Sequence, residues 1–243
     1  MTETAETNED QNPLTKPKFI IAAVIVAIIV ALGIILALVP KGGATAGPTA
    51  PPANQTTAAS KPSTSSSASV CGLPAGDQSK PATAPADTKW ELVGKIAAPT
   101  SPKQYGPGTT ADNGLRSCFA HSPTGALYAG ANIVILASSG HNDLVIQHLT
   151  VDGPDRDRML SSASPPGSDT APSFQLAGFK FTDYSGTRAV IDYGFKVSNG
   201  TFGSLPVVLQ WDGGDWKAVP PASGQPEGKQ LSDLGGYIPW AGV

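Results

Sequence analysis

The longest apolar run in the chain, residues 19–39, constrains its architecture more than any other stretch. It reads FIIAAVIVAIIVALGIILALV and contains neither a charged residue nor a proline. As an α-helix with a rise of ~1.5 Å per residue it would be roughly 30 Å long, which is about the hydrocarbon thickness of a bilayer. A helix of a soluble core would carry a polar stripe, and this run has none. The run therefore predicts a single transmembrane helix.

The charges beside this run predict its orientation. Residues 1–18 begin acidic and end with Lys16 and Lys18, whereas Lys41 alone lies close on the far side. This asymmetry favours a disordered cytoplasmic tail over 1–18, a single pass through the cell membrane and an extracytoplasmic C-terminal part. The alternative is a signal peptide cleaved after Ala44-Thr45-Ala46, which leaves the C-terminal part on the same side.

The segment that follows, residues 40–87, has the composition of a linker. It consists almost entirely of Pro, Ala, Ser, Thr and Gly and contains no aromatic residue. Such a segment cannot bury enough apolar surface to offset the entropy lost on ordering it. We therefore expect a disordered extracytoplasmic linker between the membrane helix and a folded domain over 88–243.

Two cysteines stand on the extracytoplasmic side of this topology. Cys71 lies near the end of the linker, and Cys118 lies within the following domain. An even number of cysteines outside the cytoplasm favours a disulfide, which would hold the end of the linker against the domain. Two inert thiols are the alternative. A redox or metal role is disfavoured because the closer Cys-x-x-Cys spacing is absent.

The first half of the domain is predicted to be helical after a short extended segment over 90–96 and a loop over 99–117. Ser122 is a suitable N-cap, Pro123 suits the first helical position, and Gly140 is a stop signal. Between them, one apolar face is formed by Leu127, Ala131, Val134 and Ile135. Further short helices are expected over 142–149 and from Pro154 onward.

The second half of the domain changes to a period of two. Alternating apolar residues predict strands over 174–183 and 189–197, and Asn199-Gly200 predicts a hairpin turn. A third strand over 205–211 begins near Pro206, which indicates an edge or a bulge, and a fourth runs over 216–219. Helices followed by an antiparallel meander predict an α+β domain, with helices packed on one face of a curved sheet.

Three stretches carry a resemblance: HSPTGALYAGAN over 121–132, LQWDGGDWK over 209–217 and GYIPW over 236–240. Together they resemble the extracytoplasmic domains of bitopic membrane proteins from actinobacterial integrative and conjugative elements. Those domains are similar to the nuclear-transport-factor-two-like cone, as in the inner-membrane assembly factors of type IV secretion. The resemblance covers about residues 90–240. It implies a cone-like fold and a non-enzymatic scaffold. Cys71 and the loop over 99–117 depart from the pattern and leave the details of assembly open.

Four aromatic residues are candidates for a docking surface. Trp211 and Trp216 flank a predicted turn, while Tyr237 and Trp240 lie in a Gly-rich tail. For each pair, packing within the domain is the favoured interpretation, and docking is the alternative. The partners implied are the membrane and other envelope or transfer-machine proteins, and a homo-oligomer is left open. Nucleic acid is excluded as a partner because the net charge is −3 and only 14% of residues are charged.

No catalytic residue, cofactor or metal site is expected. Neither a nucleophile elbow nor a phosphate-binding loop nor a metalloprotease motif occurs, and no metal spacing joins His121, His141 and His148. An isomerase on a cone-like fold would need an Asp or Tyr in its cavity. The pairs Asp183-Tyr184 and Asp192-Tyr193 offer these types, but a period of two separates the members of each pair and places Tyr193 in the core.

The leading hypothesis is therefore a membrane-anchored, non-enzymatic extracytoplasmic scaffold of a conjugation or type IV secretion-like machine, which acts by protein–protein contacts. The alternative is an extracytoplasmic ligand-binding or sensing module on the same cone-like fold. That alternative requires an apolar cavity with a few convergent polar groups.

Overall fold

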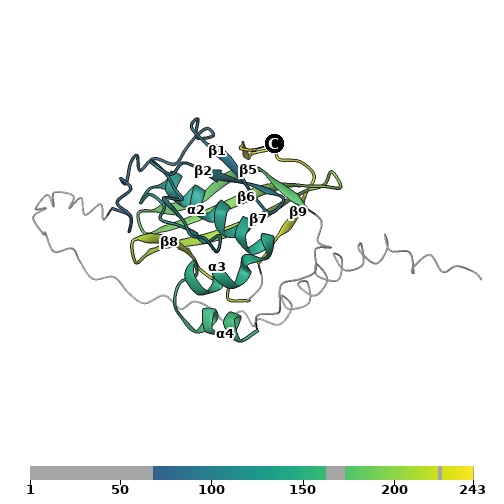
Figure 1. Cartoon of the computed structure of the whole chain (residues 1–243). Helices are drawn as coiled ribbons and strands as arrows, with labels where there is room; N and C mark the ends of the chain where they lie inside the picture. Colours follow the sequence, from purple (N-terminus) through teal and green to yellow (C-terminus); the bar gives the residue numbers. More distant parts are fainter. Residues whose placement is uncertain (1–67, 163–172, 224–225, 243) are drawn as a thin grey trace, which may run out of the picture. The chain divides into compact units, whose positions relative to one another are not determined.

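The computed structural model describes residues 68–162, 173–223 and 226–242. This part of the chain is α+β, with a few helices packed on an antiparallel sheet, as the sequence pattern predicts (Figure 1). The predicted transmembrane helix over 19–39 and most of the predicted linker lie outside these residues. Within the described ranges, no helix combines the length and the hydropathy needed to cross a membrane.

The main sheet contains the predicted meander. Strands β5 (Phe174–Ser185), β6 (Arg188–Val197), β7 (Phe202–Asp212) and β8 (Asp215–Ala218) lie side by side in sequence order, and each pair is antiparallel. Two further strands, β9 (Lys229–Leu231) and β10 (Ile238–Pro239), pair with β7 and β5 respectively. These two are too short to produce a period-two signal, so the sequence pattern does not reveal them.

Pro206 lies within β7 and not at its start. Its partner in β6 is Asp192, and the register between the two strands is continuous. On the other side of β7, β9 pairs as far as Ser204 and β8 pairs from Leu209. Proline has no N–H to donate, so it is tolerated where a strand lacks a neighbour. On this side of β7, Pro206 therefore lies in a short stretch between the residues that pair with β9 and those that pair with β8. This unpaired stretch is the edge that the sequence predicts.

The predicted first helix is α2 (Pro123–Leu136), which lies across the sheet and is buried along nearly its whole length (Figure 1). Ser122 is its N-cap, and the hydroxyl accepts a hydrogen bond from Gly125 N–H at 3.0 Å. The chain continues through a π-helical turn, η3 (Ala137–His141), in which Gly140 has φ +87°. This left-handed conformation favours glycine and ends the helix near the predicted stop.

Two short helices follow close to their predicted positions. They are α3 (Asn142–His148) and α4 (Pro154–Ser162). α3 contacts α2, and α4 contacts α3. The first residues of α4 carry Asp155 and Asp157, which interact favourably with the positive end of the helix.

Small side chains allow α2 to approach β6 closely. A Cβ at Gly130 would lie 2.3 Å from Tyr193 Oη, so no larger residue fits there without movement. Tyr193 is fully buried, and its hydroxyl donates a hydrogen bond to the Leu127 carbonyl at 2.8 Å. Tyr193 is therefore a core residue, as predicted, with its polar group satisfied by the helix backbone.

The extended segment before α2 forms an antiparallel hairpin of β1 (Lys89–Val93) and β2 (Ile96–Thr100). Lys95, which was expected in the strand, lies with Gly94 in the two-residue turn. The Gln175 side chain joins the hairpin to β5: its Oε1 accepts from Ala97 N–H, and its Nε2 donates to the Lys95 carbonyl. The predicted loop over 99–117 also holds a two-residue ladder of β3 (Thr109–Thr110) and β4 (Arg116–Ser117).

Candidate functional site

Cys71 and Cys118 form a disulfide, as the sequence predicts. Their Cα atoms lie 5.9 Å apart, and the bond closes a loop between residues 47 positions apart. Closing a loop of this size is worth ~4 kcal/mol in the chain-entropy account of disulfides. The bond joins the end of the predicted linker to the loop that precedes α2.

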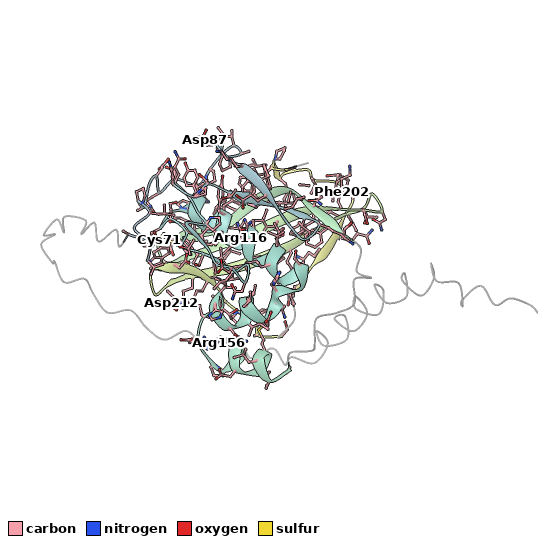
Figure 2. The ribbon with its side chains drawn as sticks, viewed as in Figure 1. Cys71, Asp87, Arg116, Arg156, Phe202 and Asp212 are labelled. Atoms are coloured by element: carbon pink, nitrogen blue, oxygen red, sulfur yellow. A yellow bond between two sulfur atoms is a disulfide. The ribbon has the colours of Figure 1, made fainter. Side chains whose placement is uncertain are left out.

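Backbone contacts add to this covalent link, and we call the whole arrangement the tether clamp: residues 69–73 with Cys118, Gly214 and Asp215. Val70 N–H donates to the Gly214 carbonyl at 2.9 Å, and Leu73 N–H donates to Ser69 Oγ at 2.7 Å. Cys71 and Asp212, labelled in Figure 2, lie at the same end of the domain. The clamp therefore fixes the chain beside the β7–β8 turn.

Asp215, a buried carboxylate at the start of β8, supports the clamp. It accepts backbone N–H bonds from Cys118 at 2.5 Å, Phe119 at 2.9 Å and Trp216 at 2.9 Å. Cys118 has φ +65°, which is uncommon for a residue other than glycine, and these bonds hold its backbone in place. Burial raises the pKa of Asp215 above its ordinary value of 3.8, and the three N–H bonds oppose that rise.

The four predicted docking residues do not form one surface. Trp216 is fully buried, and its indole N–H donates to the Ala120 carbonyl at 3.0 Å. Trp240 is 3% exposed and donates to Thr88 Oγ1 at 3.0 Å. Both rings therefore pack within the domain, which is the interpretation that the sequence favours for them.

The other two predicted docking residues are partly exposed but already engaged. Trp211 stands opposite Trp216 in the register of β7 and β8, with ring centroids 5.4 Å apart. It also stacks on His121 at 3.9 Å between ring centroids. Tyr237 donates its hydroxyl to Asp192 at 2.6 Å on the face of the sheet away from α2. Both therefore act first as packing residues.

The polar groups considered for catalysis are arranged as the alternation predicts. Asp192 bonds Tyr237, whereas its neighbour Tyr193 lies under α2, so the pair does not share a cavity. Asp183 forms an exposed ion pair with Arg188 at 3.2 Å. In the described part of the chain, no cluster of three or more His, Cys, Asp and Glu side chains is arranged to hold a metal ion.

An apolar groove of about 480 Å³ lies between the helices and β7, beside the unpaired stretch at Pro206. Its walls combine aliphatic side chains of α2, α3 and β7 with prolines of the segment after β8, and Arg188 and Glu227 are its charged groups. Sequence reasoning missed both this groove and Asp215. The groove is assembled from distant elements, and the only local signal for Asp215 is its place in the turn Gly213-Gly214-Asp215-Trp216.

A family described as a domain of unknown function, DUF8175, matches the chain over residues 50–239. The matched range includes both cysteines, the three helices and the strands of the main sheet. Neither a curated protein nor a solved structure matches the chain.

Replacing Asp215 by asparagine is expected to lower the free energy of unfolding by roughly 1–3 kcal/mol at neutral pH, because a buried N–H loses its acceptor. The native state binds more protons than the unfolded state between pH 3.8 and the raised pKa. The contribution of Asp215 to wild-type stability therefore rises as the pH falls through this window, and Asp215→Asn lacks this gain. The difference in the free energy of unfolding between wild type and Asp215→Asn should increase from neutral pH toward about pH 4. Denaturant unfolding of the full-length protein in detergent micelles measures it.

Asp212→Asn is the matched control, since Asp212 lies across the same turn in a partly exposed ion pair with Lys217. It should cost less than about 1 kcal/mol. A loss of stability in Asp215→Asn no larger than that in Asp212→Asn would contradict the role given to Asp215, and a difference from wild type that does not change with pH would contradict its raised pKa.

Proposed function

We propose a function for this chain, which belongs to the DUF8175 family: it is a membrane-anchored, non-enzymatic extracytoplasmic scaffold. It works in a conjugation or type IV secretion-like machine through contacts with other envelope proteins. Its N-terminus lies in the cytoplasm, residues 19–39 cross the cell membrane, and a linker presents the α+β domain outside.

The tether clamp is the observation that carries this proposal. A linker that merely preceded a domain would need no fixed contact with it. Here the disulfide, the Val70–Gly214 hydrogen bond and the Asp215 bonds to Cys118 and Phe119 attach the linker end to the sheet. A pull along the linker is then borne by the β7–β8 turn and by the loop before α2. Such an attachment suits a domain held in position by a membrane anchor.

The polar interior supports a non-enzymatic role. A general acid or base must face its substrate with a group free to exchange a proton. Asp215 and Tyr193 are both buried, and backbone groups occupy their oxygens. These bonds stabilise the fold and leave neither group directed into the apolar groove.

The order of elements supports the finer fold proposal. A hairpin and three helices precede the meander β5–β8, and α2 packs on the sheet that the meander forms. This order suits a cone-like, nuclear-transport-factor-two-like domain. It accords with the resemblance of residues 90–240 to extracytoplasmic components of conjugative elements.

A transfer assay with a severable linker tests the function. In a host that carries the conjugative element, the gene is deleted and then replaced by a version with a site-specific protease sequence between Gln55 and Ala59. We expect normal transfer from this strain. Cleavage by an exported protease should reduce transfer to the level of the deletion strain, because the domain is no longer anchored.

The same strain without the exported protease controls for the inserted sequence. Unchanged transfer after deletion of the gene would overturn the role in transfer. Full transfer after complete cleavage would overturn the need for an anchor.

The groove supports a second candidate, an extracytoplasmic ligand-binding module. Its volume of about 480 Å³ lies within the usual range of small-molecule sites, and Arg188 offers a cation beside apolar walls. The fluorescent probe 1-anilinonaphthalene-8-sulfonate should bind there. Binding should be lost in Val207→Trp, which fills the groove, and retained in Leu92→Trp, which adds the same ring elsewhere on the surface. Equal binding by both variants would contradict this candidate.

A further inference from the structure

The outer edge of β1 has no strand partner within the described ranges. β1 pairs with β2 from Lys89↔Thr100 to Val93↔Ile96 across a two-residue turn. In such a hairpin the residues flanking the turn exchange both hydrogen bonds, and bonded and non-bonded pairs then alternate. The N–H and C=O groups of Lys89, Glu91 and Val93 therefore point to β2, and those of Trp90 and Leu92 point away.

Contacts of β2 support this alternation. Ala97, which stands opposite Leu92, donates its N–H to Gln175 and not to β1. Pro99, which stands opposite Trp90, has no N–H, and its carbonyl accepts from Asn132. β1 thus presents two donors and two acceptors outward, with no bond to another part of the described chain. An exposed edge of this kind is a template for pairing with a further strand.

The side chains of β1 favour pairing with a strand of a particular kind. Leu92 is 71% exposed, although it is a large aliphatic residue. Lys89 and Glu91 carry opposite charges on the other face of the strand, two positions apart. Glu91 pairs with the buried Arg116 at 2.8 Å, yet 54% of its side chain remains exposed. A partner strand should therefore place a cation opposite Glu91 and an anion opposite Lys89.

We propose that this partner is β1 of a second copy of the chain, paired antiparallel about a two-fold axis at Trp90. In this register Lys89 of each copy stands opposite Glu91 of the other, which gives two complementary cross-strand pairs. An axis at Glu91 places the two Glu91 carboxylates opposite each other, and an axis at Leu92 leaves Glu91 opposite Val93. Only the axis at Trp90 places Lys89 and Glu91 each opposite a residue of opposite charge.

The size of this contact sets the conditions in which it forms. Two five-residue strands bury far less than the ~800 Å² per partner of a stable interface, so the pairing is weak between free molecules. Copies anchored in one membrane have a higher effective concentration, which compensates for a weak contact. In this respect the inference rests on the proposed function.

Site-specific photo-cross-linking in membranes tests the pairing. Two full-length copies with different epitope tags are co-expressed, and one carries p-benzoylphenylalanine at residue 92. Irradiation should give a dimer band with both tags, and the attachment should map to residues 88–90 of the second copy. The same probe at position 103, an exposed lysine outside β1, should give no such band.

Substitutions in the second copy separate pairing from proximity. Leu92→Pro removes an outward N–H and keeps the bonds to β2, and Lys89→Glu places two carboxylates opposite each other. Either change should reduce the mixed dimer several-fold, whereas Lys103→Glu should leave it unchanged. The disulfide, checked by gel mobility without reductant, reports that each variant is folded.

Three outcomes would overturn the proposal: no dimer band, a band that Leu92→Pro and Lys89→Glu leave intact, or attachment only to a different protein. None of these outcomes changes the result of the transfer assay, so the scaffold role can hold even if β1 does not pair. Conversely, if the mixed dimer forms but deletion of the gene leaves transfer unchanged, the pairing is supported and the scaffold role is rejected.

Discussion

Two of the three hydrogen bonds to the buried Asp215 carboxylate hold together parts of the domain that are distant in sequence. They connect the first residue of β8 with Cys118 and Phe119, just before the N-cap of α2, and the third bond comes from the adjacent Trp216 N–H. Trp216 adds a bond to Ala120 in the same loop. Because the disulfide starts from Cys118, the position of the linker end depends on this carboxylate. The sheet edge, the start of α2 and the tether clamp are therefore one connected unit.

Features determined by neighbouring residues could be predicted from the sequence. Ser122 and Pro123 define the start of α2, and the alternation through Tyr193 gives the strand face that α2 covers. Features that need distant partners could not. Strands β9 and β10 have only three and two residues, and their pairing with β7 and β5 depends on the meander being formed first. Packing of Trp240 was the favoured interpretation, but its partners, Thr88, Trp90 and Tyr128, lie far away in sequence and could not be named from it.

The same contrast applies to the candidate site. The disulfide was predictable from two cysteines and a topology, whereas Asp215, the groove and the open edge of β1 appear only when the elements are assembled. The clamp lies at the β7–β8 turn, and the free edge belongs to a hairpin attached to β5 through Gln175. The linker end is thus attached at one element, and the strand edge proposed for pairing belongs to another.

The reactivity of Cys71 and Cys118 in intact cells tests most directly whether the clamp forms outside the cytoplasm. A membrane-impermeant maleimide that adds a visible mass is applied before and after mild reduction. No labelling should occur without reductant, and after reduction the exposed Cys71 should react in intact cells. Labelling without reductant would contradict the disulfide, and labelling of reduced protein only after lysis would contradict the extracytoplasmic location.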